Sequence, residues 1–319
     1  MKKKVARKTG TINSAGRRTA ETSWGEKPEE NMSLSFTILA SGSTGNAAVV
    51  ASKEAAVLVD AGLSLRKIEA LMAERNLSGA DIDAVLVTHE HTDHIRGLGA
   101  FVRKYNVPVY ANEKTLGALR RELADLDASL RRVLPTGGVL EIADLRVESY
   151  AVSHDAAEPV GYCFFAGGKK LAMATDLGYV SDKVIRRLAD ADVLVLEANH
   201  DVEMLRMGRY PWNVKRRILG DTGHLSNDAA GEALLRLLAG TTRRVYLAHL
   251  SLEHNLMDLA KLTVNRILEE NGVTFRPEEF MLCETYPDRP TPWDDAGRPN
   301  GEAPALLPSP RLSGESPPG

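Results

Sequence analysis

Three of the eight histidines in the chain lie within seven consecutive residues, THEHTDH. His89 and His91 are one residue apart in a turn, so both can point at one cation. Asp93 and His94 follow at the start of a helix and can point at a second cation. The alternative is that Thr92 or Asp93 caps this helix, which explains one residue and leaves the three histidines without a role. The stretch therefore favours a metal site.

Further ionisable residues come directly after short apolar runs. Asp60 follows AVLV, His154 follows SYAVS and Asp176 follows LAMAT. Glu197 follows DVLVL, and His249 follows VYLA. In α/β sheets, functional sites collect beyond the carboxyl ends of the strands. Strand ends also hold side chains rigidly, which suits metal ligands. The pattern predicts that these residues contribute to one site.

The positions of these residues depend on strands and helices that the same sequence predicts. The predicted strands are residues 36–40, 47–51, 56–60, 84–88, 145–153, 160–166, 170–175, 193–197 and 245–249. The predicted helices are residues 65–75, 95–105, 182–191 and 227–238. The strand runs are apolar almost throughout, as in sheets that are buried on both faces. This predicts a layered α/β fold with two sheets packed between helices.

The two ends of the chain differ in composition from the middle. Residues 1–32 are polar and basic, and residues 287–319 carry nine prolines, so we expect both segments to be disordered tails. Met32 directly precedes the first apolar run and is an alternative start of the protein. Residues 33–286 are expected to form a single domain, near the upper size for one hydrophobic core.

Composition limits the partners and the compartment. The formal net charge is −3, so any nucleic acid must be held by a local basic patch. Apolar runs are too short to span a membrane, and the basic N-terminal stretch lacks the apolar core of a secretory signal. Cys163 and Cys283 lie in apolar surroundings and are expected to be reduced. These features predict a cytoplasmic protein without a membrane partner, and they leave the oligomeric state open.

THEHTDH resembles the HxHxDH signature of the metallo-β-lactamase superfamily. That superfamily also places a histidine, an aspartate and a final histidine after later strands, and His154, Asp176 and His249 match them in this order. The resemblance covers roughly residues 34–284. It implies a single-domain αββα sandwich, with two mixed sheets packed between helices.

The resemblance also implies a set of ligands for two divalent cations. Three residues are implied for each cation: His89, His91 and His154 for the first, and Asp93, His94 and His249 for the second. Asp176 would bridge the two cations, and Asp60 would orient a ligand unless it only caps its strand. Imidazoles and carboxylates suit Zn²⁺ or Mn²⁺. Two such cations, about 3.5–4 Å apart, activate a shared water and clamp both sides of a displacement.

Longer segments narrow the resemblance within the superfamily. ILASGSTGNA, EANHDVEMLRMGRYPWNVKRRILGDTGHLSN and YLAHLSLEHN are similar to the YycJ/WalJ branch, phosphodiesterase-type hydrolases linked to DNA exonuclease activity. In tRNase Z-like phosphodiesterases, a strand-end glutamate and a histidine in a GHST motif donate a proton to the leaving oxygen. Glu197 and His224, in LEANH and GHLS, resemble that pair and form the implied catalytic set together with Asp93. The alternative is that His224 caps the following helix.

Candidate substrate-binding residues lie in three segments. Backbone N–H groups and hydroxyls of the SGSTGN turn are suited to phosphate, although the turn also suits a tight hairpin. The segment YPWNVKRR mixes aromatic and basic side chains, which can stack bases and neutralise phosphates or can form a basic helix face. The candidates from these segments and from the neighbourhood of Glu197 and His224 are Ser43, Thr44, Asn46, His200, Lys215, Arg216 and Ser226. His200 is equally compatible with a surface position. The pairs Arg131–Arg132 and Arg243–Arg244 are expected to be solvated charges.

The sequence thus predicts a dinuclear metal-dependent phosphodiesterase, most simply an exonuclease that acts on DNA at 5′ ends. A hydroxide bridging the cations would attack phosphorus, and His224, oriented by Glu197, would protonate the leaving oxygen. One alternative is a thioesterase or lactonase of glyoxalase II type. The other is a metal-stabilised module that binds nucleic acid without catalysis. The metal, the nucleic acid and the polarity of attack are not fixed by the sequence.

Overall fold

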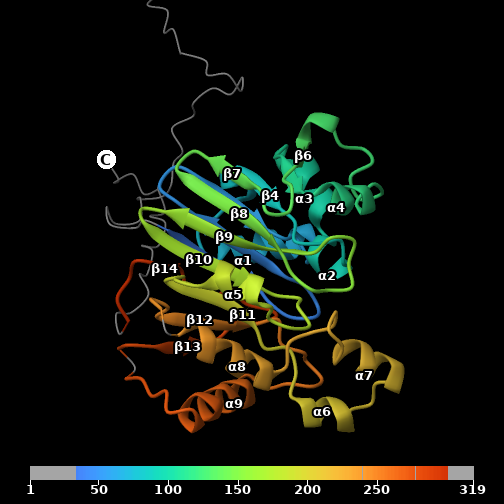
Figure 1. Cartoon of the computed structure of the whole chain (residues 1–319). Coiled ribbons are helices and arrows are strands. Elements are labelled where there is room, and N and C mark those ends of the chain that lie inside the picture. The colour runs from blue at the N-terminus through green and yellow to red at the C-terminus, as the bar shows by residue number, and fades with distance from the viewer. Residues whose placement is uncertain (1–33, 239, 277, 301–319) are drawn as a thin grey trace, which may run out of the picture.

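The computed structural model of the chain describes residues 34–238, 240–276 and 278–300. Within these residues, two seven-stranded sheets lie face to face (Figure 1). The first sheet has, from edge to edge, β14 (Asp294–Asp295), β1 (Ser35–Ala40), β2 (Ala47–Ala51), β3 (Ala56–Val59), β4 (Ala84–Leu86), β5 (Val109–Ala111) and β6 (Arg131–Val133). Pairing is antiparallel from β14 to β3 and parallel from β3 to β6, so the sheet is mixed.

The second sheet repeats this pattern of directions. It has, from edge to edge, β13 (Met281–Cys283), β12 (Arg244–Ala248), β11 (Val193–Glu197), β10 (Lys169–Ala174), β9 (Val160–Ala166), β8 (Leu145–Ala151) and β7 (Val139–Ile142). Pairing is antiparallel from β7 to β10 and parallel from β10 to β13. Each sheet therefore has a half in which neighbouring strands end at the same edge.

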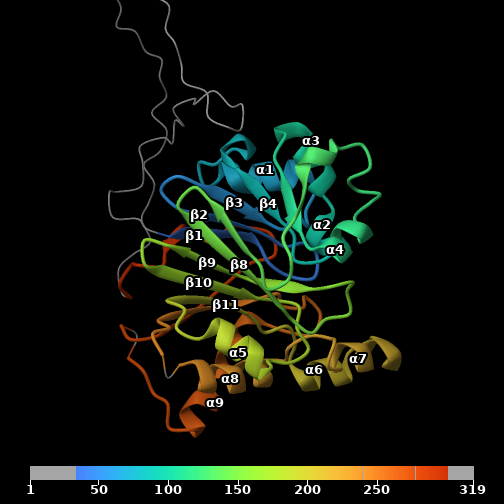
Figure 2. The ribbon, with the colours of Figure 1, turned by 45° about the horizontal axis from the view of Figure 1, so that its top comes forward.

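Helices cover the outer face of each sheet (Figure 2). The helices beside the first sheet are α1 (Leu65–Ala73), α2 (Thr92–Ile95), α3 (Leu98–Tyr105) and α4 (Glu113–Ala118). Those beside the second sheet are α5 (Asp182–Leu188), α8 (Asn227–Leu237) and α9 (Met257–Glu270). Two short helices, α6 (Val202–Met207) and α7 (Trp212–Ile218), project from the body of the domain. We refer to α6 and α7 as the helical arm.

Apolar side chains fill the three spaces between these layers. Phe36 and Tyr246 meet between the sheets, with ring centroids 5.2 Å apart. Phe101 packs between the first sheet and its helices, and Leu194 packs between the second sheet and its helices. Strands that are apolar on both sides contribute to two cores at once, which is why their sequences show little alternation. The predicted αββα sandwich is confirmed.

The predicted strands and helices are present, and several elements were not predicted. The helix expected at residues 95–105 is divided at Gly97 into α2 and α3. Helix α9, the short helices α4 and α6, and five short strands were missed: β5, β6, β7, β13 and β14. Among the described residues, no helix is long and apolar enough to cross a bilayer.

The last described residues form a strap across both sheets. β14 pairs with β1 of the first sheet, while the buried Arg244 of the second sheet donates to the carbonyl of Asp295 (2.6 Å) and pairs with Asp294 (3.0 Å). The disorder predicted from residue 287 is therefore wrong up to residue 300, and Arg244 is not a solvated charge. The predicted tail at 1–32 and the remainder of the other, 301–319, lie outside the described residues.

Candidate metal centre

The ionisable residues predicted to share a site converge where the parallel strands end. β11 and β12 pair in register, with Glu197 opposite Ala248, so Glu197 lies beside the next residue along β12, His249. Asp60, Asp176 and His249 have φ of 59°, 56° and 57°, a left-handed conformation that non-glycine residues rarely adopt. Each lies one or two residues after the end of a strand. Such backbone conformations are concentrated at functional sites.

The first group of candidate ligands is His89, His91 and His154, whose ring nitrogens lie within 4.8 Å of one another. His154 Nε2 lies 3.3 Å from His91 Nδ1. The other nitrogen of His154 donates to the carbonyl of Gly223 (3.0 Å), and His89 Nδ1 lies 3.0 Å from Thr88 Oγ1. Fixing one imidazole nitrogen leaves the other free to bind a metal, as in known metal sites.

The second group is Asp93, His94 and His249. Asp93 Oδ2 lies 3.4 Å from His94 Nε2 and 3.5 Å from His249 Nε2. The opposite nitrogens of both histidines are held by buried carboxylates: His94 Nδ1 donates to Asp60 (2.8 Å) and His249 Nδ1 donates to Glu197 (2.9 Å). Each carboxylate fixes the tautomer and orientation of its ring.

Asp176 lies between the two groups. Its Oδ2 is 3.2 Å from His94 Nε2, and its Oδ1 is 3.7 Å from His154 Nε2. Among the described atoms, Asp176 Oδ2 and His89 Nε2 are buried without a hydrogen-bond partner. Buried polar atoms are almost always satisfied, so two such atoms in one cluster fit a missing cation. The donor set of imidazole and carboxylate also fits a divalent metal of the Zn²⁺ or Mn²⁺ type.

The charges within the cluster shift the pKa values of its members strongly. Burial alone would lower the pKa of His249, but Asp176, Asp93 and Glu197 raise it to about 10. Burial alone would raise the pKa of Asp93, but hydrogen bonds from His249 and His94 hold it well below its usual range. The carboxylates therefore favour positive charge at His94 and His249, whose pKa values they raise. A metal that binds here competes with protons for these nitrogens.

Glu197 and His224 form a contact next to both groups. His224 Nδ1 donates to Glu197 Oε1 (2.8 Å), and the His224 ring centroid lies 5.0 Å from that of His154 and 5.2 Å from that of His249. Glu197 is completely buried and also accepts from the backbone N–H groups of Leu177 (2.9 Å) and Leu225 (3.1 Å). Burial would raise the pKa of Glu197, but His224 and His249 lower it to about 2. Glu197 is therefore a fixed anion that links His224 to His249.

The cap of helix α8 is a different residue. Ser226, and not His224, is the N-cap of α8, and its Oγ accepts from the N–H of Ala229 (3.1 Å). The capping alternative for His224 is therefore wrong. The Ser226 hydroxyl expected to bind substrate serves the helix as an acceptor.

Two other candidates for substrate contact have internal roles. Lys215 is buried and donates to the carbonyls of Arg206 (2.6 Å) and Gly208 (2.7 Å). Asn46 is buried, bonds both the N–H and the carbonyl of Gly42, and lies 3.2 Å from His94 Nε2. Asn46 therefore holds the turn and the second ligand group in place. The expectation that Lys215 and Asn46 bind substrate is not supported, because their polar atoms are already engaged.

His200 is only 1% exposed, so the expectation that it contacts substrate or lies at the surface is wrong. Neither of its ring nitrogens has a hydrogen-bond partner among the described residues. By contrast, Ser43, Thr44 and Arg216 are exposed and keep the accessibility that a substrate contact needs.

Two residues that support the cluster were not predicted. Asn199 donates to the carbonyl of His249 (2.8 Å), and Thr88 donates to Asp60 (2.8 Å) through its hydroxyl. Both are adjacent in sequence to predicted site residues or one position removed from them. Their positions within VTHEH and EANH were a usable signal, because polar side chains at strand ends next to ligands commonly orient those ligands.

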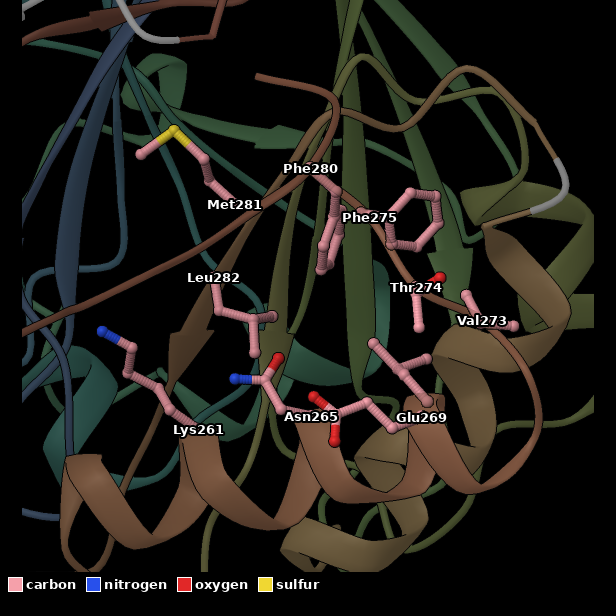
Figure 3. Close-up of a pocket in the computed structure, with 10 residues that line it drawn as sticks. Lys261, Asn265, Glu269, Val273, Thr274, Phe275, Phe280, Met281 and Leu282 are labelled. Carbon is pink, nitrogen blue, oxygen red and sulfur yellow. The ribbon is translucent and has the colours of Figure 1, made fainter. Parts of the chain in front are cut away.

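A separate cavity of about 320 Å³ lies between α9 and β13 (Figure 3). Val273, Phe275, Phe280 and Leu282 make much of its wall apolar, and Lys261 and Glu269 are the charged residues among those that line it. β13 pairs with the beginning of β12, whereas His249 follows its end. This cavity is therefore distinct from the candidate metal centre.

Comparisons with known proteins agree with this geometry. Residues 55–250 match the family described as "Beta-lactamase superfamily domain". The chain is 48% identical over 260 residues to "Exodeoxyribonuclease YycJ" of Bacillus anthracis, covering 82% of this chain and 98% of the relative. It is 44% identical over 261 residues to "Exodeoxyribonuclease WalJ" of Streptococcus pneumoniae, covering 81% and 96%.

A solved structure shows the same fold. The metallo-beta-lactamase fold protein YhfI from Bacillus subtilis superposes with a TM-score of 0.61 at 14% identity, covering 81% of this chain and 99% of that one. At this identity the likeness concerns the fold alone. The family match and the two relatives show that the chain is an enzyme of the metallo-β-lactamase superfamily of metal-dependent hydrolases and belongs, within it, to the YycJ/WalJ family.

Proposed function

We propose that the chain is a dinuclear metal-dependent phosphodiesterase that degrades DNA as an exonuclease from 5′ ends. The observation that carries the choice of a phosphodiester is the contact between His224 and Glu197 beside both ligand groups. An alkoxide is a poor leaving group and needs a proton, and an imidazole held by a buried carboxylate can supply one. The names of the relatives, both exodeoxyribonucleases, support DNA as the substrate.

In this proposal, the two ligand groups and Asp176 hold two divalent cations, Zn²⁺ or Mn²⁺. Bound there, the cations would supply an activated water and neutralise the phosphoryl oxygens. The protein's own groups do the rest. Asp60 and Glu197 fix the rings of His94 and His249, and Asp93 completes the second group and belongs to the catalytic set.

His224 is the proposed proton donor. Its Nδ1 is engaged by Glu197, so its Nε2 is the atom that would carry a proton to the leaving oxygen. The side chain is 18% exposed, whereas Glu197 is completely buried, so the substrate meets the imidazole and not the carboxylate. Glu197 thus acts by orienting the His224 ring so that Nε2 is the nitrogen left for the substrate.

Exposed residues around the centre are proposed to bind the nucleic acid. Ser43 and Thr44 occupy the turn after β1, and the Asn46 side chain fixes that turn. Arg216 lies on α7 of the helical arm, whose Trp212 is 60% exposed and available to stack on a base.

The proposed enzyme is cytoplasmic. Its two cysteines are free thiols, with Cys163 buried and Cys283 half-buried, and reduced cysteines and a DNA substrate both fit that compartment.

The test is an assay with end-labelled single- and double-stranded DNA and RNA, and with a thioester, on the Mn²⁺ and Zn²⁺ forms. We expect DNA to be shortened stepwise from 5′ ends, and labels at either end separate the two polarities. Asp176→Ala should abolish the reaction with little loss of fold, because it removes the group between the two ligand sets. Wild-type turnover by Asp176→Ala on every substrate would refute the metal mechanism.

The variant His224→Ala separates the proposal from its rivals. A thioesterase releases a thiolate, which needs no general acid, so His224→Ala would then be nearly silent. A phosphodiesterase should lose about 10²–10⁴-fold in kcat. Tight DNA binding without turnover by either metal form would favour a non-catalytic binding module.

A further inference from the structure

Arg217 lies in the last turn of α7, and the structure fixes that turn against the candidate metal centre. Lys215 anchors α7 to the end of α6 through the carbonyls of Arg206 and Gly208. The N–H of His224 donates to the carbonyl of Ile218 (2.9 Å). The backbone of Gly223 approaches so closely that an added Cβ would lie 2.3 Å from the carbonyl of Arg217. The end of α7 is therefore packed onto the segment that carries the proposed proton donor.

The side chain of Arg217 reaches the first ligand group through a carboxylate. Arg217 Nε donates to Asp155 Oδ2, and Asp155 Oδ1 lies 3.4 Å from His154 Nε2. Asp155 directly follows the proposed metal ligand His154 in the sequence, so it holds the guanidinium beside the first ligand group. A salt bridge through Nε leaves the two terminal amino groups of the guanidinium without a partner among the described residues.

This arrangement suits recognition of a phosphate. The Arg217 side chain is 55% exposed, so an anion can approach it from solvent. The two free amino groups form a planar fork that matches two phosphate oxygens. The surroundings otherwise carry several carboxylates, among them Asp93, Asp155 and Asp176, so a fixed cation at the rim offsets repulsion of a polyanion.

We propose that Arg217 binds a second phosphate of the substrate, next to the one that is hydrolysed, and thereby makes the site selective for a polynucleotide over an isolated phosphodiester. The inference rests on the proposed phosphodiesterase function and adds the feature of the substrate that is recognised. Asp155 is the positioning residue in this role, because it acts by holding the guanidinium.

The test compares Arg217→Ala with Arg217→Lys and with a matched control, Arg206→Ala. Arg206 lies on the same helical arm, is 57% exposed and pairs with Glu203 (2.8 Å), but its partner is not next to a metal ligand. Two measurements are made on the metal-loaded enzymes: kcat and KM for a short oligonucleotide and for bis(4-nitrophenyl) phosphate, and binding of a fluorescent oligonucleotide as a function of salt.

For Arg217→Ala we expect a rise of about tenfold in KM for the oligonucleotide, from loss of a hydrogen bond between charged groups. The ratio of kcat/KM for the oligonucleotide to that for the small diester should fall by a similar factor. The slope of log binding constant against log salt should become shallower by about 0.7–0.9, the value for one phosphate contact. Arg217→Lys should retain part of the affinity, and Arg206→Ala should change none of these quantities.

Each outcome discriminates. Equal losses on both substrates would show that Arg217 only supports His154, and would overturn the proposal. If the wild-type enzyme cleaves DNA and Arg217→Ala behaves like Arg206→Ala in both measurements, the proposal is overturned and the nuclease function stands. Weaker, less salt-dependent binding by Arg217→Ala in a protein that does not cleave DNA would support the phosphate contact and refute the nuclease function. A wild-type enzyme that neither binds nor cleaves a polynucleotide would refute both.

Discussion

Replacing Glu197 by glutamine tests the group on which most of the site depends. Glu197 accepts four hydrogen bonds: from His224 and His249 on Oε1, and from the N–H groups of Leu177 and Leu225 on Oε2. Glutamine keeps one acceptor oxygen and presents an amino group in place of the other. Two of the four donors therefore lose their acceptor in either orientation of the amide.

The structure gives the size of each effect. An unsatisfied buried donor costs about 1–3 kcal/mol, so Glu197→Gln should lower the free energy of unfolding of the metal-free protein by about 2–6 kcal/mol. Loss of the partner that orients His249 should weaken metal binding by about 10–100-fold. Loss of the partner that orients His224 should lower kcat by about 10²–10⁴-fold even when metal is saturating.

Three assays separate these effects: urea unfolding in the presence of a chelator, titration with Zn²⁺ or Mn²⁺, and DNA cleavage at saturating metal. Glu203→Gln is the control, because Glu203 is 71% exposed and pairs with the solvent-facing Arg206, away from the candidate ligands. A Glu197→Gln enzyme that kept wild-type kcat and metal affinity would refute the role assigned to the carboxylate. Reduced stability alone would make Glu197 a structural residue.

Further predictions concern stability. Asp294→Ala leaves the buried Arg244 without its carboxylate and should lower the free energy of unfolding by about 3–5 kcal/mol, measured by urea denaturation. Lys215→Met should detach α7 from α6 and increase amide hydrogen exchange in the helical arm, while an unchanged exchange rate would contradict the anchoring role. Burial lowers the pKa of His200 from 6.5 to about 4, so between these values the unfolded chain binds more protons and stability falls as the pH falls. The full effect is about 3.5 kcal/mol, at about 1.4 kcal/mol for each of about 2.5 pH units. The wild type should show this pH dependence in its free energy of unfolding and His200→Phe should not, so equal pH dependence in the two proteins would refute it.

The sequence predicted which residues converge at the candidate centre, because local sequence features mark them. His89, His91, Asp93 and His94 lie in one short motif, and the remaining candidate ligands each follow an apolar run. Parallel strands that end at one sheet edge bring such residues together whatever the connections between them. The positions of the strand ends were therefore enough to predict a shared site, and the loops did not have to be predicted.

The sequence was less informative about side chains whose partners are distant. Arg244 is part of an apparently ordinary Arg–Arg pair, and its partner Asp294 lies in a proline-rich segment that composition alone assigns to disorder. Lys215 lies in a basic run, which by itself suggests an exposed side chain. Its amino group is buried because the chain turns back from α6 to α7 and places the carbonyls of Arg206 and Gly208 next to it. In both cases tertiary contacts, not local propensity, decide the environment.

Glu197 shows the same limit within the site itself. Its place at a strand end and its resemblance to a proton-donating glutamate predicted a role with His224. Its second contact, with His249, arises from the register of β11 on β12, which places residues 52 positions apart side by side. The substrate contacts expected of Asn46 and Lys215 are not supported for a related reason. A polar side chain near a site can have its hydrogen-bonding groups occupied by the surrounding backbone, as both of these do.

The pairing of β14 with β1 bears on how the chain is made. Ser35 bonds Asp295 across 260 residues, so the outer edge of the first sheet is among the last contacts that synthesis can allow. At about 5–20 residues per second, β1 waits roughly 13–50 s on the ribosome for its neighbour. During that interval its backbone groups form an open edge, which invites pairing with other nascent chains. If a ribosome stalls before Asp294, every proposed metal ligand has already been translated. The open edge of β1 still lacks its partner strand, so the unfinished chain can aggregate through that edge.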